Sequence, residues 1–401
     1  MNVAKQSYVI RERKKSKGYA YFLAILPLIM MYHAPGLQLG ITSLLIAVGM
    51  VYAGLEVIRN FSKVQWPLLI ILSFYLAYVA VKSTGANMLL SLAIWVHVSA
   101  ISTGVINDKT LRRVVETVSV FAALCVILQQ IVHTFTGTHL PMVNAEWLIA
   151  DMQDNYAPLI ANGMSEADAM YRPCAFFLEP AHFTQYVMFG LGSTLFQSKP
   201  NIKKAILISI GLIATTSGMG FVIVFAIWGW WYMTVNVKQN SRNLIGRLVL
   251  IVALMVLLVM LLNNIPFFER IISRFTGSGS SDYNAIDGRL FFWDTIFGGL
   301  GTGDLITGYG DAQQYQLEEV YLTGFMKVLY MYGIIGFTLL SIFLLYLLKK
   351  VHIDAKAFVL IYIGLLFLAN LTGFIPMIFN FGMIIALSQS FSVQSQQSNY
   401  L

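Results

Sequence analysis

The chain has 401 residues, of which 57% are hydrophobic and only 11% are charged. Soluble domains carry about 25% charged residues, and one soluble domain cannot bury this much apolar surface, so we expect a polytopic membrane protein with lipid as its main solvent. The net charge of +7 would suit nucleic acid. The cations, however, lie in short segments between apolar runs, where they orient a membrane protein, and this excludes a nucleic-acid partner.

The N-terminal sequence RERKKSK at 11–17 precedes a long apolar run without a small-residue cleavage site. It predicts a retained signal anchor and no cleaved signal peptide. Because a transmembrane helix needs about 20 apolar residues, the hydropathy pattern predicts an all-α fold of about 12 transmembrane helices. The predicted spans are 19–34, 37–58, 65–82, 86–106, 114–135, 177–197, 202–217, 219–236, 248–265, 321–348, 356–373 and 375–390.

Two of these predictions leave an alternative open. Only Ser217 and Gly218 separate 202–217 from 219–236, so this pair could form one bent element. The last span, 375–390, is short and could lie at the membrane interface.

The positions of the basic residues predict the orientation in the membrane. With the N-terminus inside, every lysine and arginine falls on the inner side except Lys82, Arg172, Arg270, Arg274, Arg289 and Lys327. Inner loops of membrane proteins are enriched in these residues, so we expect both termini in the cytoplasm. Cys125 lies in an apolar run and Cys174 in an external segment, which predicts neither a disulfide nor a cysteine-based metal site.

This topology makes residues 1–401 a single membrane domain with two long external loops, 136–176 and 266–320. The loops hold most of the acidic residues, and loops of this length are uncommon unless they are functional or disordered. The tract TGSGSSDYNA at 276–285 predicts a flexible insert in the second loop. Chemistry is therefore expected in these loops and at the helix ends beside them.

The stretch RPCAFFLEPAHFTQYV at 172–187 places Arg172, Glu179 and His182 at the start of a strongly apolar run. Pro180 suits the first turn of a helix, and His182 precedes Lys199 by about 26 Å of helix, in a hydrocarbon core about 30 Å thick. These groups are therefore predicted at the outer boundary. A carboxylate and a neutral imidazole are both competent bases, and a guanidinium suits phosphate. Alternatively, Arg172 and Glu179 form a structural clamp and His182 is structural.

The second external loop contains three further arginines. PFFERIISRF at 266–275 sets Arg270 and Arg274 one helical turn apart, which predicts an interfacial helix that rests on headgroups or binds substrate. DGRLFFWDTIF at 287–297 predicts a short helix that carries Arg289. Lys327 lies about 33 Å before Lys349 along a straight helix and so at the outer surface.

Other polar and glycine-rich positions give weaker indications of function than the two arginine-containing segments. GLGTGDLITGYG at 299–310 is not preceded by a strand, so it predicts no nucleotide site, although its backbone freedom suits a substrate loop. His97 and Asn370 fall inside apolar spans and are predicted to make interhelical contacts.

Four segments resemble, in order, a known family. FLEPAHFTQY, which begins at Phe177, resembles the FxEPxHFxxY signature of the bacterial O-antigen and capsule repeat-unit polymerases (Wzy-type). TTSGMGF at 215–221 resembles their Ser-Gly turn, DGRLFFW at 287–293 their second outer loop, and YLTGFMKVLYMYGIIGF at 321–337 their closing span. Related O-antigen ligases place a His-Asn pair before the last of these spans. The sequence here, QLEEVYLTGF, has no histidine, which favours a polymerase.

The resemblance implies a GT-C-like glycosyltransferase in the bacterial inner membrane. It would transfer a growing glycan from undecaprenyl diphosphate onto a lipid-linked oligosaccharide repeat unit at the outer face, with a chain-length regulator protein as a further partner. Neither loop contains a DxD metal motif, so we expect no cofactor and no metal. Glu179 or His182 would be the catalytic base, and the leaving diphosphate would bind Arg172, Arg289, Arg270, Arg274 and Lys327.

Two other functions remain as alternatives: an O-antigen ligase-type glycan transferase and a polysaccharide flippase or transporter. Transporters place charges or broken helices near the bilayer midplane. In this sequence the ionisable residues outside the inner loops are predicted at the outer surface, which favours an interfacial enzyme.

Overall fold

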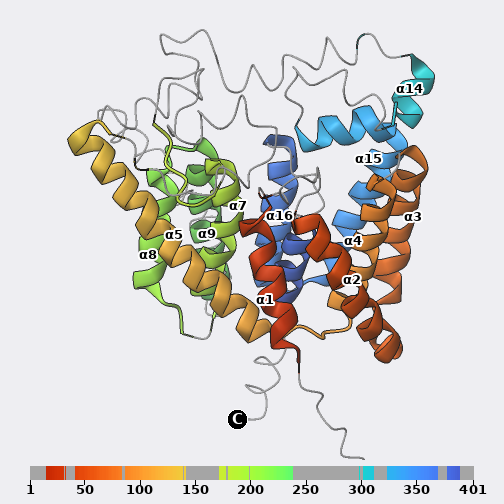
Figure 1. The fold of residues 1–401 in the computed structure, drawn as a ribbon, viewed down its shortest axis with the longest axis horizontal. Coiled ribbons are helices and arrows are strands. Elements are labelled where there is room, and N and C mark those ends of the chain that lie inside the picture. The colour runs from red at the N-terminus through yellow and green to blue at the C-terminus, as the bar shows by residue number, and fades with distance from the viewer. Residues whose placement is uncertain are drawn as a thin grey trace, which may run out of the picture.

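The computed structural model describes residues 15–30, 32, 41–83, 86–138, 140, 171–177, 179–197, 199–237, 298, 301–310, 323–368 and 377–388. In this part of the chain the regular structure is helical, and Ser16 and Ile106 form an isolated bridge. Figure 1 shows the helices packed side by side in a bundle, with the long α5 crossing it obliquely. The all-α prediction is confirmed.

The helices overlap every predicted span except 248–265, which lies outside the described residues. The α-helices are α1 (Lys17–Ile25), α2 (Ile41–Arg59), α3 (Trp66–Lys82), α4 (Ala86–Ser102), α5 (Asp108–Thr136), α7 (Pro180–Leu195), α8 (Ile202–Ala214), α9 (Gly218–Val237), α14 (Thr302–Thr307), α15 (Gly324–Lys350) and α16 (Ile353–Leu368). Short 3-10 turns follow α1 and α2 at Leu26–Leu28 and Phe61–Lys63. A further helix, Met377–Ser388, carries no label.

Capping residues set where several helices begin. The side chains of Ser16, Asn107 and Asn201 accept hydrogen bonds from backbone N–H groups in the first turns of α1, α5 and α8, which satisfies donors that the helix itself leaves free. The Asn107 cap starts α5 at Asp108, before the predicted start at 114. The predicted boundary is wrong because it followed the onset of apolar residues, whereas the cap places a charged first turn in the helix.

The pair α8 and α9 forms two helices and not one bent element. The indole nitrogen of Trp228 in α9 donates to the hydroxyl of Ser209 in α8 at 2.9 Å, which fits an antiparallel hairpin. The turn between them is buried, with Thr215, Thr216 and Ser217 at most 5% exposed.

The centre of the bundle is formed by α7 and the helix Met377–Ser388. In α7 every residue from Phe183 to Leu195 is buried, and residues 377–387 of the last helix are buried as well. Tyr186 of α7 stacks on Phe379 at 5.1 Å between ring centroids. The alternative that span 375–390 is interfacial is therefore wrong. The helix is only about 18 Å long, and its apolar residues pack inside the protein.

The helix α15 is broken at Gly333, whose φ of 62° and ψ of −170° are not helical. The carbonyls of Tyr330 and Met331 lie in the turn before the break. They accept hydrogen bonds from the backbone N–H groups of Tyr309 and Gly310, at 3.0 and 2.8 Å. The glycine-rich segment at 301–310 is thus docked backbone to backbone on α15, beside the end of α3, where Lys82 donates to the Gly308 carbonyl at 3.0 Å.

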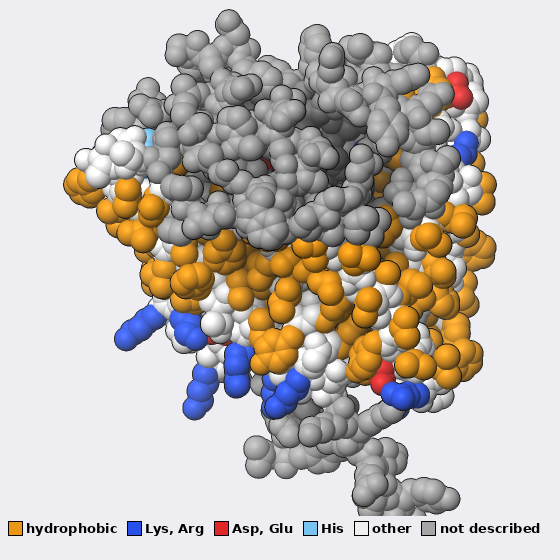
Figure 2. All heavy atoms as spheres, in the orientation of Figure 1, with side chains coloured by type: hydrophobic (Ala, Val, Ile, Leu, Met, Phe, Trp, Pro, Cys, Tyr) orange, Lys and Arg blue, Asp and Glu red, His pale blue; other side chains and the backbone are white. Residues whose placement is uncertain are grey.

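The outer surface of the bundle is apolar. Within the described ranges, three helices are long and apolar enough to cross a membrane: Ile41–Arg59, Asp108–Thr136 and Gly324–Lys350. Large apolar side chains point outward along them, for example Val48 at 69%, Ile58 at 74% and Phe135 at 83% exposed. Figure 2 shows a broad band of hydrophobic side chains across the visible face. Soluble monomers rarely expose apolar patches of this extent.

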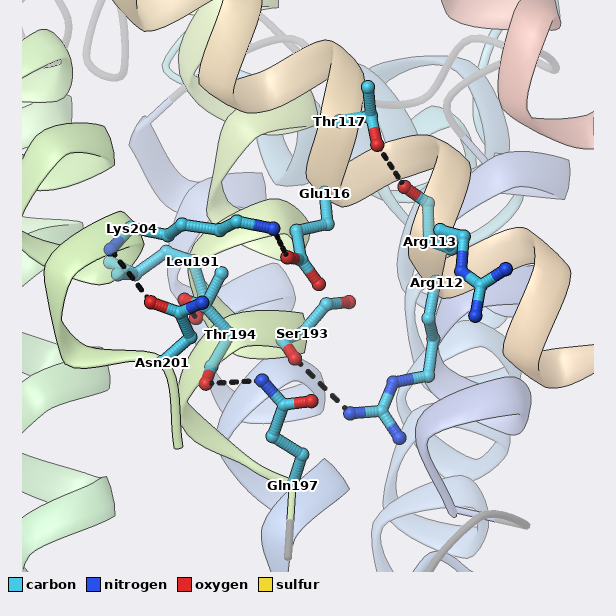
Figure 3. A network of polar contacts seen from close by, with 10 residues as sticks. All are labelled: Arg112, Arg113, Glu116, Thr117, Leu191, Ser193, Thr194, Gln197, Asn201 and Lys204. Carbon is cyan, nitrogen blue, oxygen red and sulfur yellow. Dashed lines mark hydrogen bonds and ion pairs between the residues drawn. The ribbon is translucent and has the colours of Figure 1, made fainter. Parts of the chain in front are cut away.

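Basic residues gather at one end of the bundle, below this band in Figure 2. There Lys15 pairs with Asp108 at 2.9 Å, and Lys204 pairs with Glu116 at 2.6 Å. Arg112 donates to the carbonyl of Phe196 at 2.8 Å and so ties the end of α7 to the start of α5. It also donates to the carbonyl of Ser193 at 3.3 Å, the bond that Figure 3 shows from close by. We call this end, with the starts of α1, α5 and α8, the basic end.

His97 is a structural residue, as predicted. Its Nδ1 lies 2.7 Å from the Tyr19 hydroxyl and its Nε2 lies 3.1 Å from the Ile46 carbonyl. Since the carbonyl can only accept, Nε2 carries the proton and Nδ1 accepts from the tyrosine. One imidazole therefore links α1, α2 and α4. Asn370 lies outside the described residues.

Candidate functional site

The start of α7 lies at the end of the bundle opposite the basic end. Pro180 occupies the first turn, and the first helical hydrogen bond runs from the Phe183 N–H to the Glu179 carbonyl at 3.1 Å. The Glu179 side chain does not cap the helix, and within the described residues its carboxylate accepts no hydrogen bond. It is half-buried, so it is available to a proton or a ligand. We call residues 171–182 the α7 mouth.

The α7 mouth brings together three of the predicted site residues. The charges of Glu179 and Arg172 both act on the thiol of Cys174, and Glu179 also acts on the imidazole of His182. Burial, reinforced by Glu179 and opposed by Arg172, raises the pKa of Cys174 to about 12. The thiol is therefore neutral and donates to the Phe177 carbonyl at 3.0 Å. A cation and a carboxylate thus act on one neutral thiol, and the same carboxylate acts on the imidazole.

His182 is oriented by the helix but not held by a hydrogen bond from the described part of the chain. His182 is partly buried, and its Nδ1 is buried without a partner among those residues. A buried ring nitrogen without a partner is uncommon in folded proteins. The geometry therefore leaves His182 free to accept or donate one hydrogen bond to a ligand at the α7 mouth.

The backbone beside these side chains is strained. Among the described residues only two non-glycine residues have a positive φ, Ala175 at 55° and Thr216 at 54°. Each costs of order 1–3 kcal/mol, and such residues cluster at functional sites. Thr216 lies in the turn between α8 and α9, and its hydroxyl donates to the carbonyl of Tyr171 at 3.5 Å. The turn at 215–221 is therefore placed against the α7 mouth.

Three residues of this site were missed by the sequence analysis: Gln129, His133 and Tyr171. The ring of His133 in α5 lies 4.2 Å from that of Tyr171, and the side chain of Gln129 accepts from the backbone N–H of Ala175 at 2.8 Å. Burial raises the pKa of Tyr171 to about 12, so its hydroxyl stays neutral. A signal was present, because two polar residues four positions apart in an apolar helix share one face.

Lys327 lies on a different part of the molecule. It belongs to the first segment of α15, before the break at Gly333, and α15 packs on α3, α14 and α16, whereas α7 packs on α5, α8 and α9. Because the helix is broken at Gly333, the straight-helix distance from Lys327 to Lys349 does not apply. The placement of Lys327 at the outer surface stays a prediction. Lys327 is half-buried and makes no side-chain hydrogen bond within the described part. No contact among the described residues joins it to Arg172.

The other predicted diphosphate ligands, Arg270, Arg274 and Arg289, lie outside the described residues, as does most of both external loops. Within the described ranges, no three His, Cys, Asp or Glu side chains are placed to hold a metal ion. Of the predicted site around Arg172, the structure therefore describes only the α7 mouth.

No family model matches this chain, and no curated protein matches it.

Proposed function

We propose that this protein is a polysaccharide polymerase of the bacterial inner membrane. It transfers a growing glycan from undecaprenyl diphosphate onto a lipid-linked oligosaccharide repeat unit at the outer face. The single observation that carries the proposal is the α7 mouth, where Glu179 acts on both Cys174 and His182 and Arg172 acts on Cys174, beside strained backbone at the end opposite the basic end.

The surface of the bundle supports a membrane location. Its outward side chains are large and apolar, and its basic residues gather at one end. By the positive-inside rule the basic end faces the cytoplasm, with both chain termini on that side and about twelve spans in a GT-C-like arrangement. The α7 mouth then faces outward, at the depth where a lipid-borne diphosphate meets water.

The proposed step joins two sugars and releases a lipid diphosphate. A hydroxyl oxygen of the acceptor sugar forms a bond to the anomeric carbon of the donor glycan, while the bond from that carbon to the diphosphate oxygen breaks. Glu179 or His182 takes the hydroxyl proton. Guanidinium and ammonium groups offset the charge on the departing diphosphate, with Arg172, Arg270, Arg274, Arg289 and Lys327 as candidates.

A transporter is the second candidate, because α15 is broken and the helix Met377–Ser388 is short and buried. Broken helices at the midplane are typical of transporters. The break at Gly333, however, lies about 26 Å from Lys350 along the helix, close to the outer boundary of a core about 30 Å thick. The polar groups of the α7 mouth lie at the same end, which favours an interfacial enzyme.

Gene deletion followed by a glycan gel tests the proposal. A polymerase predicts that long chains collapse to a single lipid-linked repeat. A ligase predicts polymer that stays on its lipid carrier, and a flippase predicts that no glycan reaches the outer face. Either of the last two results would refute the polymerase.

A further inference from the structure

One buried side chain holds both ends of the first external loop. Gln129 of α5 is 4% exposed. Its Nε2 donates to the carbonyl of Leu140 at 2.9 Å, and its Oε1 accepts from the N–H of Ala175 at 2.8 Å. Leu140 lies near the start of the loop 136–176 and Ala175 at its end. A single amide therefore ties together two backbone segments that are far apart in sequence.

The hydrogen bond from the Ala175 N–H to Gln129 lies at a strained and buried backbone position. Ala175 has a φ of 55° and is 1% exposed, so its N–H cannot bond to bulk water. A strained residue persists only when its surroundings fix it, and a buried N–H without a partner is strongly unfavourable. Ala175 lies between Arg172 and Glu179 in the chain. Gln129 therefore supports the segment that sets the spacing of these two charged groups.

A second contact from the same helix face acts on the same segment. His133, four residues after Gln129, lies against the ring of Tyr171 with 4.2 Å between centroids. From the other side, the hydroxyl of Thr216 donates to the Tyr171 carbonyl. The segment 171–175 is thus braced by α5 and by the turn between α8 and α9, through the buried polar side chains of Gln129 and Thr216.

We propose that Gln129 is a positioning residue: it does not touch the substrate, and it fixes Arg172 and Glu179 relative to each other by bonding the two ends of the loop. The expected effect on turnover rests on the proposed function. The two hydrogen bonds by which Gln129 holds the loop ends, here called the clamp, do not depend on it. A displacement of about 1 Å in a catalytic group can lower turnover roughly 100-fold. Loss of both amide bonds is therefore expected to lower turnover by about that factor.

Labelling of Cys174 tests the clamp without any assay of function. In a Cys125→Ala background, Cys174 is the remaining thiol, and it lies in the braced segment. Gln129→Leu should make Cys174 react with a maleimide in the purified, folded protein. Gln130→Leu is the matched control, because Gln130 is the next residue of the same helix and its Oε1 has no partner in the described part. Equal protection of Cys174 in both variants would overturn the clamp.

Polymer synthesis at matched amounts of folded protein tests the positioning. Gln129→Leu should lose roughly 100-fold in turnover, while Gln130→Leu should resemble the wild type. Gln129→Glu keeps an acceptor for Ala175 but offers a donor to Leu140 only when protonated, so its activity relative to the wild type should increase as the pH is lowered. A variant that merely destabilised the fold would show no such pH-dependent rescue, and Gln129→Glu also serves if Gln129→Leu does not fold.

The outcomes separate this inference from the proposed function. If Cys174 becomes reactive in Gln129→Leu while turnover stays at the wild-type level, Gln129 is not a positioning residue. If the wild-type protein makes no polymer, the proposed function fails, and the labelling result alone decides whether Gln129 holds the loop ends together.

Discussion

Replacing Gly333 by alanine should release the segment 301–310 from α15. Gly333 adopts φ 62° and ψ −170°, a region that is nearly restricted to glycine, so alanine there costs about 1–3 kcal/mol. The new Cβ would also overlap the backbone of Ile306 and Gly308, which cannot rotate away as a side chain can, and such overpacking costs about 1–3 kcal/mol more. A total of about 3 kcal/mol corresponds to a roughly 100-fold shift between docked and released segment.

Hydrogen exchange read by mass spectrometry measures this shift. The N–H groups of Tyr309 and Gly310 donate to α15 at 3.0 and 2.8 Å, so the peptide that contains them should exchange roughly 100-fold faster in Gly333→Ala. Gly303→Ala is the matched control, because no atom lies within 4 Å of a Cβ at that position and alanine favours a helix. Exchange at the wild-type rate in Gly333→Ala would refute the docking.

Three further predictions concern the candidate site. Arg172→Ala and Arg289→Ala should each abolish long glycan chains but leave single lipid-linked repeats. Arg289→Lys should also make no long chains if the diphosphate needs two parallel hydrogen bonds. Full glycan ladders on a gel would exclude these arginines as diphosphate ligands. Polymer synthesis should continue in EDTA, and a loss that magnesium restores would indicate a metal. In a Cys125→Ala background, Cys174 should be alkylated slowly at neutral pH and faster only as the pH approaches its pKa of about 12, because the thiolate is the reactive form; rapid labelling of folded protein at neutral pH would contradict its burial.

Much of the fold could be predicted because its signals are local. Hydropathy located α3 and α9 to within one or two residues, and Pro180 predicted the start of α7. The alternation of cations predicted one basic end, which the bundle displays. Proximity in the sequence predicted that Arg172, Glu179 and His182 lie together, because they fall within one short stretch of chain.

The remaining features depend on contacts between distant segments. The amide of Gln129 meets Ala175 across the first loop, and no pattern around either residue encodes that bond. The burial of Met377–Ser388 follows from the ring of Phe379 stacking on Tyr186 of α7, whereas its short length alone suggested an interfacial element.

By itself, the sequence determined a helical bundle with an apolar exterior, one basic end and a charged α7 mouth, because composition, periodicity and capping act over a few residues. Only the tertiary structure decided that α15 breaks at Gly333 and that α5 braces the α7 mouth. In both cases a backbone group finds its hydrogen-bond partner more than twenty residues away along the chain, and only the folded arrangement brings such partners together.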